Sequence, residues 1–182
     1  MKCLPGTTIE INERLRNMND AAQNILDNIF ATGGLMLSQV SALSGLENHT
    51  IQNWVKRGFL SSPIKKQYSK RQFCRIILIN LLKETIQIDQ VLKLLSYVNG
   101  NLADESDDLI DDSALYNYYV NMINGIEKNE NPQNAVDNVL KDYTEPIPGG
   151  KKRLSKVLLI MYYAGMSSYY RRCGEKILYE LN

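Results

Sequence analysis

Apolar residues recur at intervals of three and four along most of the chain, the spacing that places them on one face of an α-helix. Between residues 19 and 31, for example, Ile25, Leu26 and Ile29 share one face, and Gly33-Gly34 ends the helix. Seven further segments show the same spacing: 39–44, 48–57, 70–84, 87–98, 113–127, 132–143 and 151–181. The pattern predicts a mainly α-helical protein.

Two segments depart from this spacing. Residues 59–68 contain Pro63, which lacks a backbone N–H and excludes a helix, so this segment is predicted to form two short strands or an extended hairpin. Residues 7–17 alternate only weakly, which is consistent with a frayed helix or an arm.

The two short helices at 39–44 and 48–57 are joined at Gly45, a residue that tolerates a left-handed backbone. Such a pair can form a helix-turn-helix if the two helices share a small core. With Leu37 as position one, apolar residues occupy positions four, ten, fifteen and eighteen, where the helices would face each other: Val40, Leu46, Ile51 and Trp54. Ser44, at position eight, departs from the apolar residue usual there. Because any two short helices joined by a glycine can show this pattern, the flanking residues matter.

Charge is strongly segregated behind a formal net charge of +1. Residues 47–83 carry eight basic residues against Glu47 alone, a balance of +7, whereas residues 100–145 carry eleven acids against two bases, a balance of −9. Residues 146–182 return to +5. A local basic block is what a polyanion-binding protein needs, although it can also be a solvated face. Since the block coincides with the predicted helix-turn-helix and hairpin, a nucleic acid is the favoured partner.

The first turn of the helix at 48–57 would enter the major groove of duplex DNA. Amide side chains there can pair with adenine, and cations at the helix end and on the hairpin can contact phosphates. The candidate DNA-binding residues are His49, Thr50, Gln52, Asn53, Lys56, Arg57, Lys65, Lys66, Tyr68, Lys70 and Arg71. A solvated first-turn position is an equally good interpretation of His49, the only histidine, and Trp54 is expected to belong to the core.

Three stretches of the chain carry a resemblance to known proteins: LSQVSALSGL from Leu37, TIQNWVKRGFLSSPIKKQYSKRQFCRI from Thr50, and IQIDQVLKLL from Ile86. Together they resemble the MerR-like DNA-binding domain of bacterial transcription regulators. The motifs GL-x-x-x-TIQNWVKRG and LSYVNG resemble more closely a family of uncharacterised bacterial proteins, described as a domain of unknown function, over about residues 20–125. The MerR resemblance implies a winged helix-turn-helix fold with a small β-hairpin wing, a homodimer, and transcription regulation by sequence-specific binding to double-stranded DNA.

The chain also departs from the MerR pattern. Recognition helices of that family usually carry an arginine where Gln52 stands and a tyrosine where Asn53 stands, and the wing here is shorter. These departures support an alternative function, a non-enzymatic protein-interaction adaptor that keeps the fold without strong DNA binding. The acidic segment could also fold back on the basic block and compete with DNA, which deletion of residues 104–112 would test.

Tyrosine is concentrated in the second half of the chain, where nine of the eleven lie between Tyr116 and Tyr179. One interpretation is an aromatic-lined pocket for a small apolar effector. The favoured interpretation is a tyrosine-rich helical core or a dimer seam.

Other classes of function find little support. The three cysteines are far apart, which favours a reducing, cytoplasmic setting over a disulfide framework. One histidine and scattered cysteines do not make a metal site, and Gly33-Gly34 and Gly149-Gly150 lack the pattern of a phosphate-binding loop. No nucleophile-base arrangement or membrane-length apolar run is recognised. The expectation is a protein that is not an enzyme and uses no metal, no cofactor and no membrane.

The expected organisation therefore has four parts. An N-terminal arm and helix (1–34) precede the winged helix-turn-helix (35–100). An acidic, solvated linker (101–112) then leads to a C-terminal helical region (113–182) that would mediate dimerisation or sensing.

Overall fold

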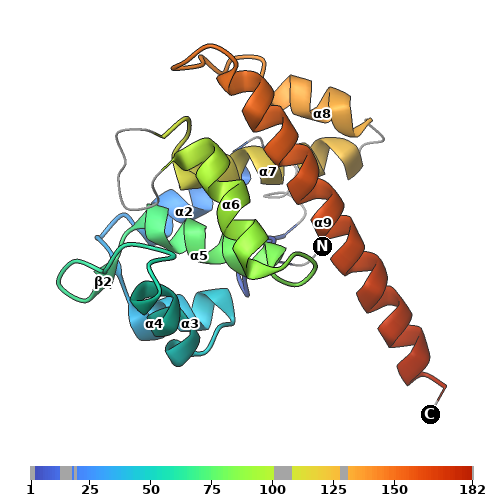
Figure 1. Ribbon diagram of the computed structural model, residues 1–182. Coiled ribbons are helices and arrows are strands. Elements are labelled where there is room, and N and C mark those ends of the chain that lie inside the picture. The colour runs from blue at the N-terminus through green and yellow to red at the C-terminus, as the bar shows by residue number, and fades with distance from the viewer. Residues whose placement is uncertain (1–2, 13–17, 19, 101–107, 128–130, 182) are drawn as a thin grey trace.

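The computed structural model describes residues 3–12, 18, 20–100, 108–127 and 131–181, and this part of the chain is mainly helical, as the apolar spacing predicts. It contains eight helices and one two-stranded antiparallel sheet (Figure 1). In chain order the elements are α2 (Ala21–Ile29), β1 (Leu35–Met36), α3 (Leu37–Ser44), α4 (Asn48–Lys56), β2 (Gln67–Tyr68), α5 (Lys70–Leu82), α6 (Ile88–Asn99), α7 (Asp112–Glu127), α8 (Pro132–Val139) and α9 (Gly150–Tyr179).

Helix α5 lies at the centre of the molecule. Eight of its thirteen residues are buried, and the helix packs against α3, α6, α7 and α9. Its first turn is fixed by Ser69, whose hydroxyl accepts a hydrogen bond from the backbone N–H of Gln72, while the Gln72 side chain accepts one from Ser69. A helix that is apolar on almost every side is the expected centre of a core, although its spacing predicts only one apolar face.

One continuous hydrophobic core runs from Leu4 in the N-terminal segment to Ala164 in α9. The predicted segments 35–100 and 113–182 both contribute to it. Helix α7 packs on α2 and α5, and α9 packs on α5, α6, α7 and α8. Residues 3–12 form no helix. They fold back through a bridge between Cys3 and Glu10, and Leu4 is buried.

The end of the acidic segment is part of this core, so the prediction that residues 101–112 form a solvated linker is wrong for residues 108–112. Leu109 is 6% exposed, Ile110 is 7% exposed and Asp112 is fully buried. The backbone N–H of Leu109 donates to the carbonyl of Val98, and the Tyr143 hydroxyl donates to the carbonyl of Leu109, each at 2.8 Å. The adjacent apolar residues Leu109 and Ile110 therefore attach this end of the acidic segment to the core. Residues 101–107 lie outside the described part of the chain.

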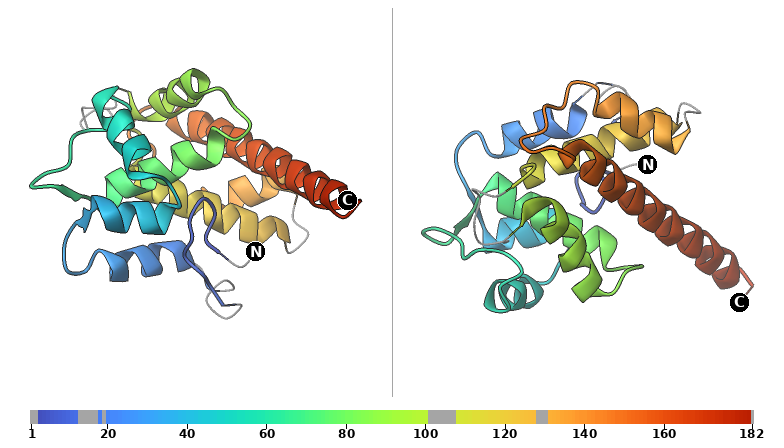
Figure 2. Two further views of the ribbon diagram at one scale, coloured as in Figure 1. Left: turned by 90° about the horizontal axis from the view of Figure 1, so that it is seen from below. Right: turned by 45° about the horizontal axis from the view of Figure 1, so that its top comes forward.

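Helix α9 is longer than the body that it packs against. Its last buried residue is Ser168, and beyond it Ile177, Leu178 and Tyr179 are 63%, 63% and 82% exposed. Figures 1 and 2 show this end of α9 projecting away from the other helices. Among the described residues, no helix combines the length and the apolar character that crossing a membrane requires.

Candidate nucleic-acid interface

The turn between α3 and α4 has the geometry that the sequence predicts. Gly45 follows the last residue of α3 and adopts a left-handed backbone with φ of 70°, and its N–H donates to the carbonyl of Ser41 at 2.9 Å. L-residues with a side chain rarely adopt this conformation, so the turn favours glycine. The chain can therefore reverse within three residues and begin α4 at Asn48.

The two helices share the predicted small core. Val40 and Ile51 are fully buried, and Leu46 and Trp54 are 8% and 5% exposed. Ser44, the residue that departs from the apolar pattern, is buried too, and its hydroxyl accepts a hydrogen bond from the Leu46 N–H at 3.3 Å. A polar residue is tolerated there because the turn supplies its partner.

The start of α3 differs from the prediction. The apolar spacing predicts a helix from residue 39, but the helix begins at Leu37 and its N-cap is Met36. The side chain of Gln39 accepts a hydrogen bond from the Met36 N–H at 2.8 Å. This contact satisfies an N–H that the start of a helix leaves without a partner.

The strand pairing also differs from the predicted hairpin. Residues 59–68 contribute one strand, β2, which pairs with β1. The register places Leu35 opposite Tyr68 and Met36 opposite Gln67. The hairpin is reduced to a bridge between Ile64 and Gln67, closed by Lys65 and Lys66 at φ of 49° and 65°. Pro63 limits the first arm, because it has no N–H to donate to a ladder.

Most of the predicted contact residues lie on the surface around α4. His49, Gln52 and Asn53 are exposed along the helix, Thr50 is half-buried, and Lys56 and Arg57 are exposed at its end. Lys65 and Lys66 are exposed at the tip of the hairpin turn. In Figure 1, α3, α4 and this turn lie at the lower left of the molecule, apart from the C-terminal end of α9 at the lower right.

Comparison with known proteins bears on this region directly. Residues 10–119 match the family described as "Domain of unknown function (DUF1836)". The chain belongs to the DUF1836 family. It is also 26% identical over 107 residues to "Uncharacterized protein YkrK" of Bacillus subtilis (strain 168), an alignment that covers 57% of this chain and 46% of that protein. The chain thus spans about half the length of that relative. No solved structure matches it significantly.

The matched region runs from residue 10 to Tyr119 in α7, so it contains the whole candidate interface. For one residue of this region, Tyr68, the prediction of a contact with DNA is wrong. Tyr68 is only 3% exposed, because β2 pairs with β1 in a register that turns this ring into the core. Burial raises the pKa of its hydroxyl. Tyr68 is a core residue, and its ring is not available to DNA.

Lys70 and Arg71, at the start of α5, have carboxylate partners within the chain. The Lys70 ammonium lies 2.7 Å from Asp27 of α2, which holds the pKa of that carboxyl below its usual value. Arg71 pairs with Asp108, and its Nε lies 3.4 Å from Asp112. Basic residues at the start of a helix are unfavourable without an anion nearby. In this DUF1836 protein, aspartates of its own chain supply that anion.

Beneath Arg71 lies a buried ion pair between Arg75 and Asp112, which the sequence did not predict. The Arg75 side chain, 3% exposed, contacts Asp112 through Nε at 2.9 Å and Nη2 at 2.8 Å, and the Asn99 amide donates to the same carboxylate at 3.1 Å. Burial raises the pKa of Asp112, and Arg75 opposes that rise. The sequence carries a signal for this pair: Arg75 stands among apolar residues from Phe73 to Ile79, and a buried cation needs an anion.

Proposed function

We propose that this protein binds double-stranded DNA through a winged helix-turn-helix of the MerR-like kind, with α4 as the recognition helix. The observation that carries the proposal is the combination of a glycine turn, a closed four-residue core and an exposed polar face on one short helix pair. The core holds α4 at a fixed angle to α3, so that His49, Gln52 and Asn53 face outward together. That is the arrangement a helix needs to reach base edges in a major groove.

The proposal divides the contact residues by chemistry. His49, Thr50, Gln52 and Asn53 would face bases, because amide and hydroxyl groups can read their edges. Lys56, Arg57, Lys65 and Lys66 would contact phosphates, since they are exposed. Lys70 and Arg71 form a weaker part of the phosphate surface, because a contact to DNA would compete with their pairing to aspartates.

A homodimer completes the proposal. Two recognition helices about 34 Å apart would enter successive major grooves on one face of the duplex. The projecting end of α9 supports it, since Ile177, Leu178 and Tyr179 are exposed and apolar and a second copy would cover them. Sedimentation velocity at micromolar concentration tests the dimer, and a monomer would remove this part of the proposal.

Selection of genomic fragments by the purified protein, followed by a salt titration of the best fragment, tests the function. A sequence-specific regulator should enrich a small set of fragments, and the logarithm of its affinity should fall steeply with the logarithm of the salt concentration. Enrichment of no fragment, with weak binding lost by physiological salt, would reject the proposal.

Lys65→Ala tests the proposed phosphate surface. It should weaken binding to all sequences alike and flatten the salt slope by about one unit, because one phosphate contact is lost. Lys93→Ala is the matched control, since Lys93 is exposed on α6, outside the proposed contact set. An equal effect of both substitutions would remove Lys65 from the interface.

The alternative function is a protein-interaction adaptor that keeps the fold without strong DNA binding. The presence of Gln52 where MerR-type proteins usually carry arginine favours it, and so does the pairing of Arg71 with the acidic segment. An adaptor would show the failed selection described above and would retain a specific protein partner.

A further inference from the structure

A cavity of about 560 Å³ lies between the N-terminal segment, the end of α5, and helices α7 and α9. Its lining is mostly apolar and includes Pro5, Leu81, Ile123, Tyr162 and Met166. The volume is within the range of small-molecule sites, roughly 300–1,000 Å³. It is separate from the DNA-facing surface of α4, none of whose residues line it.

The walls of the cavity are anchored by hydrogen bonds. The hydroxyl of Tyr116, fully buried in α7, donates to the carbonyl of Pro5 at 2.8 Å, and the Thr7 hydroxyl donates to the carbonyl of Leu4 at 3.0 Å. The first bond holds the N-terminal segment against α7, and the second fixes the turn within that segment. The cavity is therefore a built feature of the fold, of the largely preformed kind that small ligands use.

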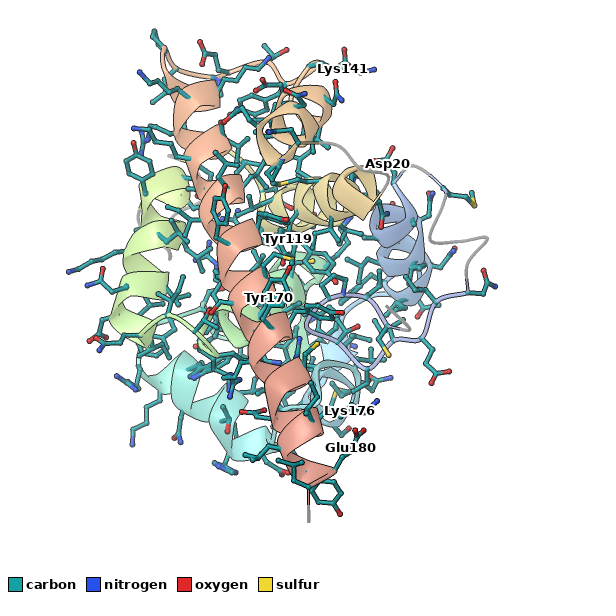
Figure 3. All side chains as sticks on the ribbon, turned by 90° about the vertical axis from the view of Figure 1, so that its right-hand side faces the viewer. Asp20, Tyr119, Lys141, Tyr170, Lys176 and Glu180 are labelled. Atoms are coloured by element: carbon teal, nitrogen blue, oxygen red, sulfur yellow. The ribbon has the colours of Figure 1, made fainter. Side chains whose placement is uncertain are left out.

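A tyrosine hydroxyl that makes no hydrogen bond to a described residue reaches this cavity. Tyr119 lines it and is 2% exposed, and its hydroxyl makes no hydrogen bond to any residue that the structure describes. The ring lies against α9, as Figure 3 shows, where a Cβ at position 165 would be 2.5 Å from the Tyr119 hydroxyl oxygen. Burial raises the pKa of this hydroxyl well above its usual value, so it stays protonated. A ligand in the cavity that carries an acceptor could therefore receive a hydrogen bond from this hydroxyl.

The charged groups at the rim neutralise one another. Glu84 accepts a hydrogen bond from Ser168 and lies 3.7 Å from Arg171 and 3.5 Å from Arg172. Arg171 also pairs with Glu175 at 3.1 Å. Two carboxylates thus face two guanidiniums, which leaves no excess charge for an ionic ligand to pair with.

We propose that this cavity is a binding site for a small, uncharged and largely apolar molecule that carries a hydrogen-bond acceptor opposite Tyr119. The apolar lining would provide most of the affinity, and the Tyr119 hydroxyl would fix the orientation of the ligand. This inference goes beyond the proposed function, because the site forms within one chain and needs no DNA.

The cavity is connected to α3 by short hydrogen bonds. Thr8, next to the lining residue Thr7, donates its hydroxyl to the carbonyl of Ala42 at 2.7 Å and its N–H to that of Leu43 at 2.9 Å. Asn80, which lines the cavity from α5, donates to the carbonyl of Ser44 at 3.3 Å. A ligand bound to these lining residues would therefore restrain the motion of the end of α3, which leads into the Gly45 turn.

The probe for this site is 2-naphthol, a flat apolar molecule with one hydroxyl group, titrated against the full chain and followed by NMR chemical shifts. We expect saturable binding with shifts centred on Tyr119, Ile123 and Gly165. Tyr119→Phe should weaken binding about threefold to tenfold, the effect of one hydrogen bond. It should leave the melting temperature of the free protein nearly unchanged, because the hydroxyl makes no hydrogen bond to any described residue. Tyr163→Phe is the matched control, since Tyr163 is 61% exposed on α9 and lies outside the lining.

Two further measurements keep the proposal falsifiable. Leu81→Trp should abolish binding by filling the cavity, and 2-naphthoate, the anionic analogue, should bind more weakly than 2-naphthol. Hydrogen exchange of the Gly45 amide should slow when 2-naphthol binds. The proposal is overturned if 2-naphthol does not saturate, if Tyr119→Phe binds it as well as the wild type, or if the anion binds equally well. None of these outcomes depends on whether the protein binds DNA.

Discussion

At the scale of single residues, the hairpin tip stands out because two lysines hold a conformation that suits neither. A two-residue turn with positive φ at both positions is usually made of Asn-Gly, because left-handed backbone strains a residue with a side chain by roughly 1–2 kcal/mol. Lys65 and Lys66 occupy both positions and form no ion pair with any described residue. Strain of this kind collects where a protein contacts its ligand. The contribution of the tip to DNA binding can therefore be measured separately from its contribution to stability.

Substitution of Lys66 separates the two effects. Lys66→Gly should raise the free energy of unfolding by about 0.5–1 kcal/mol, because glycine adopts positive φ without strain. Lys66→Ala keeps the strain and should change stability by less than about 0.5 kcal/mol. Both should flatten the salt dependence of DNA binding by about one unit. Urea unfolding and salt titration measure these quantities, and equal stability of the two variants would mean that the turn is not strained.

At the scale of elements, the pair between Arg75 of α5 and Asp112 of α7 joins two central helices. Both side chains are almost completely buried, so removing Arg75 leaves the Asp112 carboxylate buried without its closest cation, with only Arg71 and Asn99 among the described residues as its remaining partners. Arg75→Met should lower the free energy of unfolding by roughly 3–5 kcal/mol. The double variant Arg75→Met/Asp112→Leu should recover most of that loss, because it leaves neither charge behind.

The exposed pair between Lys141 and Asp142 is the control for this prediction. Its groups are 3.8 Å apart and 73% and 89% exposed, so Lys141→Met should change stability by less than about 0.5 kcal/mol. Chemical denaturation of the four proteins gives all the values. If Arg75→Met cost no more than Lys141→Met, the buried pair would not be joining α5 to α7.

The elements also show how far the sequence could predict this fold. Each predicted helix is present, because local signals fix helices: Ser69 and Gln72 cap α5, and Gly45 ends α3. Contacts between distant segments were not predicted. The pairing of β1 with β2 joins residues about thirty positions apart, so no short connecting turn in the sequence predicts it. The burial of Asp112 depends on Arg75, which lies in another helix, so a count of charges alone indicates a solvated linker.

The same limit applies to the candidate site. The core of the helix pair and the exposed face of α4 follow from local spacing, and they agree with the structure. Whether a given side chain in the basic block is exposed depends on what packs against it. Tyr68 turns inward because of its register with Leu35, and Arg71 pairs with Asp108, thirty-seven positions away.

At the scale of the whole molecule, the basic block and the acidic segment are in direct contact, since Asp108 pairs with Arg71. The acidic segment therefore withholds a cation from the proposed DNA surface. Deletion of residues 104–112 is a poor test of this masking, because it would remove Leu109, Ile110 and Asp112 from the core. A single substitution that keeps the shape of the side chain is the sharper experiment.

Asp108→Asn is that substitution. It removes one of the three carboxylates around Arg71, and the guanidinium would then be more available to a phosphate. We expect the affinity for DNA at about 0.1 M salt to rise and the salt slope to steepen by about 0.9, the change that one added phosphate contact produces. Asp137→Asn, at an exposed position on α8, changes the net charge equally and should alter neither quantity as much. If the two variants behave alike, long-range charge explains the effect. If only Asp108→Asn tightens binding, the acidic segment restrains DNA binding through its contact with Arg71.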